Sequence, residues 1–127
     1  MPGTITVAQQ DTFSAPPIAL ATMPRLKFGS TEQDVSRDGE KKWTVQAAVT
    51  YVPEFGMKAV AEVIEVTVTG GDDPSAIIAP GTPVEFNRLR VGVSAPEKRD
   101  NGRVVGGKLY WMATAVRPLS GKSAAAA

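Results

Sequence analysis

The sequence predicts an all-β fold, a small antiparallel barrel of five or six strands with an OB-like shape and little helix. Three observations lead to this prediction. Apolar and polar residues alternate with a period of two in several segments, and turn signals rich in Gly, Pro, Asn and Asp separate these segments. No stretch has the apolar periodicity of a long amphipathic helix. Short strands joined by frequent turns are typical of closed or nearly closed antiparallel barrels.

The N-terminal part of the chain divides into an arm and the first strands. Residues 1–17 form the arm, in which 4–8 has the composition of a short strand and 9–17 is polar and ends in Ala-Pro-Pro. Residues 18–28 follow as strand, bend and strand. Pro24 marks the bend or an edge position, because proline cannot donate to a β-ladder. A polar loop with an Asp-Gly hairpin signal comes next.

The clearest strands lie in the middle of the chain. Residues 43–51 alternate between an apolar and a polar face, and 58–69 carry a run of β-branched residues that favours strand. A single helical turn is expected at 75–79. The next strand, 82–93, changes the parity of its apolar positions half-way, which predicts a β-bulge near 87–88.

The end of the chain is expected to form a β-ribbon that leads into a long strand. A charged turn at 94–102 precedes this final strand, which covers 103–117. The barrel domain is therefore expected to span 18–119. Small residues fill 120–127, which we expect to be a disordered tail.

The composition excludes several classes of site. The 127 residues suffice for one domain, and they include neither Cys nor His. Disulfides, thiolate metal sites, zinc sites and Ser-His-Asp or Cys-His catalytic groups are thereby excluded. Glu62 and Glu65 lie on opposite faces of a strand, so they do not converge as an acid–base pair. We expect a protein that is not an enzyme and has no cofactor and no metal.

The chain also lacks sequence signals for membranes and export. No apolar run approaches the roughly 20 residues that a membrane helix needs, and the N-terminus lacks the features of a signal peptide. We therefore expect a cytoplasmic protein with no membrane partner.

Positive charge is concentrated near the end of the chain. The net charge is only +1, but residues 86–117 carry seven Lys or Arg against two Asp or Glu. This concentration fits a surface that faces an anion. The alternative is that these charges are distributed over both faces of a solvated sheet.

Basic and aromatic residues in this region favour single-stranded nucleic acid, whose bases stack on rings and whose phosphates meet cations. Arg88 and Arg90 share parity and are expected about 6.6–7 Å apart on the outer face of one strand. Of the adjacent Tyr110 and Trp111, Tyr110 shares parity with Lys108 and is the expected outward ring. Two further aromatic residues are candidates: Phe55 on a loop, and Trp43, whose parity also fits the core. The residues predicted to bind nucleic acid are Arg88, Arg90, Lys98, Arg99, Arg103, Lys108, Tyr110, Trp43 and Phe55.

Three short motifs carry a resemblance to a known family. They are Lys42-Trp-Thr-Val-Gln-Ala-Ala-Val, then Pro83-Val-Glu-Phe-Asn-Arg-Leu-Arg-Val, and finally Gly-Lys-Leu-Tyr110-Trp-Met-Ala-Thr-Ala. Over about residues 41–117 the chain resembles the small plasmid replication, integration and excision activators carried by actinobacterial integrative and conjugative elements. The chain departs from that family at Ala113, where a basic residue often stands. The resemblance implies a role in processing the DNA of a mobile element.

Three functions remain open from the sequence. The first is a homodimeric accessory protein that binds single-stranded DNA during replication or transfer of a mobile element; the preference for DNA over RNA is undecided. The second is a structural or assembly β-module, such as a phage head–tail connector or minor virion protein, whose arm crosses to a neighbouring subunit. The third is a regulatory protein that acts through protein contacts only.

Overall fold

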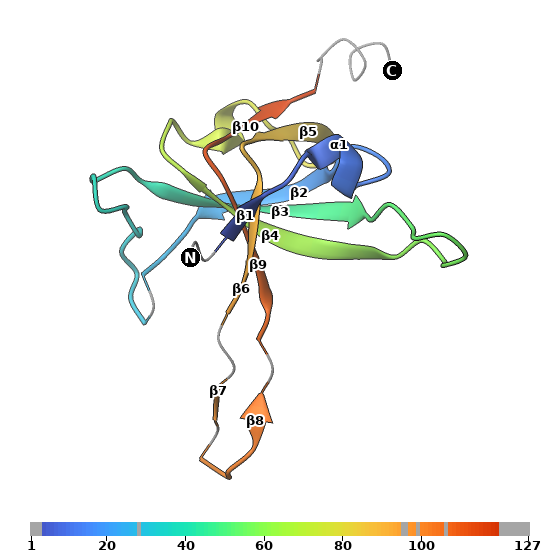
Figure 1. The fold of residues 1–127 in the computed structure, drawn as a ribbon. Coiled ribbons are helices and arrows are strands. Elements are labelled where there is room, and N and C mark those ends of the chain that lie inside the picture. The colour runs from blue at the N-terminus through green and yellow to red at the C-terminus, as the bar shows by residue number, and fades with distance from the viewer. Residues whose placement is uncertain (1–3, 28, 95–96, 99, 106, 120–127) are drawn as a thin grey trace.

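The computed structural model describes residues 4–27, 29–94, 97–98, 100–105 and 107–119. The chain is mostly β, and its fold is shown in Figure 1. In chain order the elements are β1 (Thr4–Thr6), α1 (Gln9–Thr12), β2 (Ile18–Pro24), β3 (Lys42–Thr50), β4 (Ala61–Thr69), the 3-10 turn η1 (Pro74–Ala76), β5 (Thr82–Asn87), β6 (Arg90–Val93), β7 (Glu97–Lys98), β8 (Val104–Val105), β9 (Leu109–Ala113) and β10 (Ala115–Pro118).

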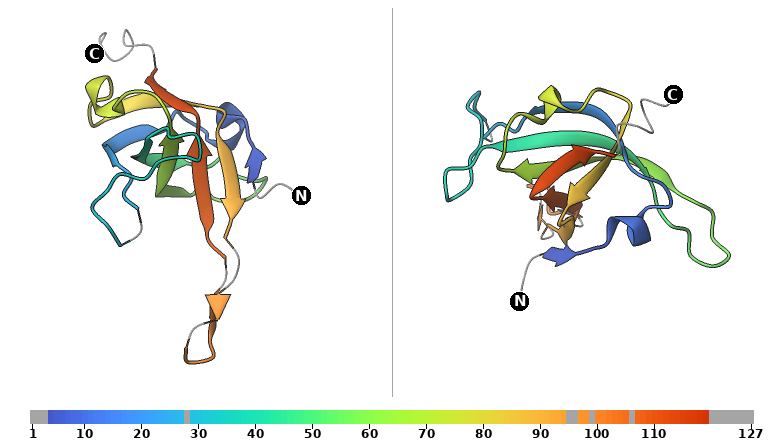
Figure 2. Two further views of the ribbon diagram at one scale, coloured as in Figure 1. Left: turned by 90° about the vertical axis from the view of Figure 1, so that its left-hand side faces the viewer. Right: turned by 90° about the horizontal axis from the view of Figure 1, so that it is seen from above.

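One mixed sheet of eight strands forms the body of the molecule and curls into a half-barrel (Figure 2). Its strand order is β1-β6-β9-β4-β3-β2-β5-β10. β4 and β9 run parallel, whereas the other strand pairs given for this sheet are antiparallel. The paired strands β7 and β8 belong to a hairpin that projects from the body (Figure 1).

The sheet corrects the predicted count of five or six antiparallel strands in a closed barrel: it has eight strands, is mixed and stays open. Backbone breaks explain the higher count. Arg88 has a left-handed φ of 55° and separates β5 from β6. Thr114 separates β9 from β10, and its backbone N–H donates to the Asn87 carbonyl at 3.0 Å. The first break lies where the change of parity predicted a β-bulge. The register does not shift across it, since Asn87 pairs with Ala115 and Arg90 with Met112, so the backbone turns at Arg88 without an inserted residue.

The core lies on the concave face of the curled sheet. On β3, every second residue from Trp43 to Val49 is buried, as the alternation predicts. On β4 the buried residues are Ile64, Val66 and Val68, again with a period of two. β9 contributes Trp111 to the same cluster. Because these residues point inward, the residues between them face outward and are available for a binding surface.

The N-terminal arm packs against its own sheet. β1 pairs with β6, and Phe13 is only 2% exposed within the core cluster. The Gln9 side-chain amide donates to the Val84 carbonyl at 3.2 Å and accepts from the Phe86 N–H at 2.8 Å. The role expected for the arm, a strand added to a neighbouring subunit, is therefore corrected: it completes the sheet of its own chain.

Candidate nucleic-acid interface

A groove of about 670 Å³ lies along the outer face of β4 and β9. It also reaches the residues that follow β2 and the base of the projecting hairpin. Three cations, two carboxylates and two aromatic side chains share its walls with apolar and hydroxyl groups. Its lining residues are Arg25, Lys42, Glu62, Val63, Ile64, Glu65, Thr67, Lys108, Leu109, Tyr110, Trp111 and Met112.

The register of β4 and β9 forms the floor of the groove. Val66 pairs with Trp111, and both side chains are buried on the concave side. Thr67 pairs with Met112 one position further on. Since successive side chains alternate between faces, Thr67 and Met112 face outward. The preceding pair, Glu65 and Tyr110, faces outward for the same reason.

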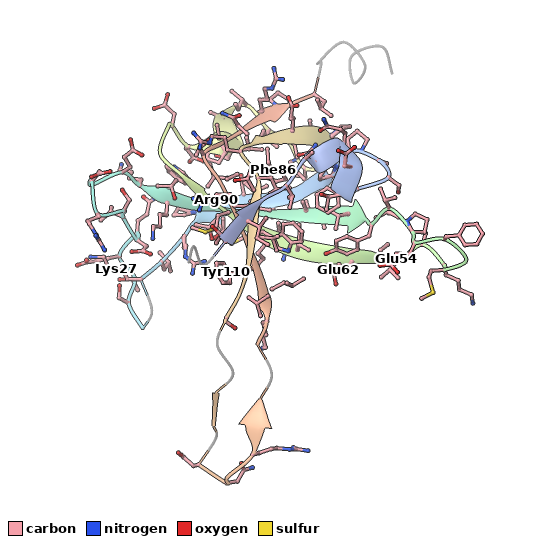
Figure 3. All side chains as sticks on the ribbon, in the orientation of Figure 1. Lys27, Glu54, Glu62, Phe86, Arg90 and Tyr110 are labelled. Atoms are coloured by element: carbon pink, nitrogen blue, oxygen red, sulfur yellow. The ribbon has the colours of Figure 1, made fainter. Side chains whose placement is uncertain are left out.

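Tyr110 is the accessible ring of the adjacent aromatic pair. It is 39% exposed, whereas Trp111 is 6% exposed, which confirms the orientation expected from its parity with Lys108. Gly92 stands opposite Tyr110 on β6 and has no side chain. Figure 3 shows Tyr110 on β9 above the hairpin, at the centre of the lower side of the sheet. The ring is therefore placed where a ligand in the groove meets it.

The three cations of the groove come from separate parts of the chain. The Arg25 Nη1 donates to Thr67 Oγ1 at 3.2 Å, which holds the guanidinium against β4. Lys42 forms a half-buried ion pair with Asp34 at 3.4 Å. Lys108 is exposed, and its backbone N–H donates to Ser94 Oγ at 2.9 Å. These contacts hold the Arg25 and Lys42 side chains and the Lys108 backbone, so three segments of the chain bring positive charge to the groove.

Two carboxylates balance part of this charge. The Tyr51 hydroxyl donates a hydrogen bond to Glu62. Burial, together with this hydrogen bond, raises the pKa of Tyr51 well above its ordinary value. Glu65 is exposed and makes no hydrogen bond or ion pair with the part of the chain that the structure describes. With three cations and two carboxylates, the lining carries a formal charge of +1.

The two arginines expected to act together lie outside the groove lining. Both are exposed, but Arg88 sits in the break before β6, so the two do not share one strand face. Arg90 pairs with Met112 across β6 and β9 and faces outward beside the groove. The prediction that both arginines lie on one strand is therefore wrong, because the left-handed backbone at Arg88 interrupts that strand.

The other two aromatic residues predicted to bind nucleic acid, Trp43 and Phe55, do not line the groove. Trp43 is 6% exposed and belongs to the core, and its Nε1 has no hydrogen-bond partner among the described residues. It is thus a packing residue, which corrects its place among the candidates. Phe55 is fully exposed, but it lies on the loop after β3, next to Glu54, which Figure 3 places far from Tyr110.

Two of the three remaining predicted residues belong to the projecting hairpin. Lys98 is part of β7, Arg103 is exposed next to β8, and Arg99 lies outside the described residues. Of the nine predicted residues, the groove brings together Lys108 and Tyr110.

Sequence reasoning missed most of the groove. Arg25 and Lys42 were not among the candidates, although each stands at the end of a strand beside a polar loop. Met112 and Thr67 were missed because only the parallel pairing of β4 with β9 makes them neighbours. The one available signal was parity, since Thr67 and Glu65 occupy the polar face of a well-defined strand.

No protein-family model matches the chain, and a search of curated proteins finds no significant match. The described residues include no group of three or more acidic, His or Cys side chains arranged to hold a metal ion. They also include no helix with the length and apolar character needed to cross a membrane.

Proposed function

We propose that the chain is a non-enzymatic protein that binds single-stranded DNA in the groove between β4 and β9. The observation that carries the proposal is the exposed ring of Tyr110 between cations from three separate segments: Arg25, Lys42 and Lys108. Stacking on an aromatic ring needs an unpaired base, and cations along a groove attract the phosphates that join such bases. A single strand satisfies both requirements, whereas the bases of a duplex are already stacked on one another.

The path of the chain adds support by fold-level analogy. We infer an OB-like path, in which β5–β6 and β9–β10 are each one segment bent at a backbone break. In OB folds, the face of the second and third strands and the loops after the first and fourth strands bind oligonucleotides. The corresponding parts here are β3–β4 and the two loops that hold Arg25 and Lys108, and each of these parts contributes at least one residue to the groove lining. Because one fold hosts many functions, the groove chemistry carries the argument.

The cellular context of this binding is proposed from the family resemblance. The motifs shared with replication, integration and excision activators imply a protein that works on a mobile element. Within that context we propose an accessory role, in which the protein coats or presents single-stranded DNA during replication or transfer. A cytoplasmic location and a homodimeric state belong to the same proposal.

The proposal is tested by fluorescence anisotropy with a labelled single strand and the duplex of the same sequence. We expect the single strand to bind more tightly. Tyr110→Ala should weaken binding at least about fivefold, because stacking is worth about 1–3 kcal/mol per base. Phe55→Ala removes an exposed ring outside the groove and is the matched control, measured on a strand too short to reach two grooves. Equal affinity for both DNA forms, or an equal effect of the two substitutions, would contradict stacking in the groove.

The positive charge of the groove is tested separately. Lys108→Glu reverses a charge in the groove, and Arg88→Glu reverses an exposed charge outside it. We expect the first to weaken binding clearly and the second to change it by less than about twofold. A larger effect of Arg88→Glu would move the phosphate path to the break between β5 and β6.

A second candidate function is an assembly module, and one observation favours it. The loop between β3 and β4 exposes four large apolar side chains, which we call the apolar loop: Val52, Phe55, Met57 and Val60. Exposed apolar patches often mark protein contacts. If the chain binds no single-stranded DNA and associates through this loop, the assembly function replaces the first proposal.

A further inference from the structure

The groove carries an acceptor whose role is not explained by attraction to phosphate. Glu65 is exposed on its floor, and its carboxylate has no hydrogen bond or ion pair within the described ranges. Glu62 differs, because it already accepts a hydrogen bond from Tyr51. A free carboxylate in a groove for a polyanion weakens the general attraction. We therefore expect the Glu65 carboxylate to distinguish between ligands and not to add to the general attraction.

The register places Glu65 beside the ring on which a base would stack. Val66 pairs with Trp111, so Glu65 and Tyr110 occupy the preceding positions on adjacent strands and share the outer face. Neighbouring strands are about 4.8 Å apart. A base stacked on Tyr110 therefore extends over the neighbouring strand, and its edge comes within reach of Glu65.

We propose that Glu65 selects the stacked base, favouring bases that carry an exocyclic amino group over thymine and uracil. This inference rests on the proposed function of the same groove. A carboxylate only accepts hydrogen bonds. The amino group of cytosine or adenine donates to it, whereas thymine presents a carbonyl oxygen at the same place on its edge. Cytosine therefore gains a charge-assisted hydrogen bond where thymine meets repulsion.

Cytosine and thymine give the sharpest comparison, because both are pyrimidines on the same backbone. They differ in the amino or carbonyl group at C4, in N3, which accepts in cytosine and donates in thymine, and in the 5-methyl group of thymine. Stacking and phosphate contacts are thus closely matched between the two. Single-stranded binding that depends only on stacking and charge has modest sequence preference. A marked preference for cytosine therefore reports on hydrogen bonding at the base edge.

The test measures the affinity of the full chain for fluorescein-labelled oligo-dC and oligo-dT of about 12 nucleotides, which lies within the site sizes of such folds. We expect the wild-type chain to bind oligo-dC about fivefold more tightly, the discrimination of one good hydrogen bond to a charged acceptor. In Glu65→Gln the ratio should fall to within about twofold, because an amide both donates and accepts. Glu54→Gln, on the exposed loop after β3, removes a carboxylate outside the groove and should keep the wild-type ratio.

The outcomes separate the two proposals. If neither oligonucleotide binds, the proposed function fails and the selectivity fails with it. If both bind equally to the wild-type chain, or if Glu65→Gln keeps the full preference, binding in the groove stands and the role of Glu65 is overturned. An unchanged melting temperature in both variants shows that the comparison is made on folded protein.

Discussion

At the scale of single residues, two adjacent aromatic side chains have opposite roles. Trp111 packs in the core, with its ring centroid 5.6 Å from that of Phe13 and 6.4 Å from that of Tyr51. Tyr110 faces the groove. We expect Trp111→Ala to lower the free energy of unfolding by about 3–5 kcal/mol, because it leaves a cavity in the core. Urea denaturation checks this value, and Tyr110→Ala should cost much less in the same experiment.

Gly107 fixes the base of the projecting hairpin by its lack of a side chain. A Cβ at this position would lie 2.0 Å from the Ser94 carbonyl oxygen. Ser94 and Lys108 are joined there by backbone hydrogen bonding. We expect Gly107→Ala to open this junction, speed hydrogen exchange at the Ser94 amide and weaken DNA binding. Lys108→Ala, which removes a cation without steric conflict, should weaken binding and leave the exchange rate unchanged.

The contact between Tyr51 and Glu62 predicts a dependence of stability on alkaline pH. The pKa of Tyr51 is raised in the folded state, first by burial and then by the hydrogen bond to Glu62. The folded chain therefore holds this proton more tightly than the unfolded chain, whose tyrosine titrates near about pH 10. The resulting stability is fully present below that pH and is lost as pH rises toward the folded pKa.

Tyr51→Phe removes this contribution and is the variant that tests it. We expect the urea midpoint of the wild-type chain to fall more steeply between about pH 9 and about pH 11 than that of the variant. Lysine titration affects both proteins alike, so the difference between the curves isolates Tyr51. Parallel curves would show that the hydroxyl has no titration linked to folding.

At the scale of elements, the N-terminal arm is bound by the body of its own chain. Phe13 anchors α1 in the core, and Gln9 bonds to the backbone of β5. We expect Phe13→Ala to lower the free energy of unfolding by about 3–5 kcal/mol and to make the arm sensitive to proteolysis. Gln10→Ala, at an exposed position of α1, is the control and should be nearly neutral. A neutral Phe13→Ala would show that the arm is dispensable.

Local sequence patterns predicted the strands in which apolar and polar residues alternate. β3 alternates between an apolar and a polar face as predicted, and the β-branched run at 58–69 contains the strand β4, whose residues from Ile64 to Val68 are buried with the same period. The break at Arg88 was visible because the apolar positions change parity between Phe86 and Leu89, both of which are buried. These features depend on neighbours in sequence, and the pleat of a strand translates them directly into faces.

Contacts between distant segments were not predictable from local patterns. The polar residues of α1 show no apolar periodicity, and only Phe13 and the hydrogen bonds of Gln9 fix the arm. The parallel pairing of β4 with β9 joins segments far apart in the chain. Arg25 reaches the groove only because this pairing places Thr67 on its floor. The candidate site therefore depended on topology, which parity alone does not supply.

At the scale of the whole molecule, residues 86–117 carry a larger excess of positive charge than the groove lining does. The groove lining has three cations and two carboxylates, so we expect a moderate salt dependence. Neutralising about three phosphates of a single strand gives a slope of about −2 in a plot of log K against log salt. Titrations at several NaCl concentrations measure the slope. A slope steeper than about −5 would require phosphate contacts well beyond the groove.

The last prediction concerns the oligomeric state. Neither edge strand of the main sheet is well suited to pair with a second copy of the chain. β1 has only three residues, and β10 has four and ends in Pro118. The apolar loop is exposed instead, and Phe55 is the most exposed of its four side chains. We expect a homodimer through this loop, since burying these side chains stabilises the contact and two grooves raise the avidity for a long strand.

Sedimentation equilibrium at micromolar concentration decides between monomer and dimer. We expect the wild-type chain to show the dimer mass and the double variant Phe55→Ser, Met57→Ser to show the monomer mass with an unchanged fold. The double variant should keep its affinity for a short oligonucleotide, because neither residue lines the groove. Its affinity for a strand long enough to reach two grooves should fall, because avidity is lost. A wild-type chain that remains monomeric across this range would refute the dimer and leave the apolar loop free for a different partner.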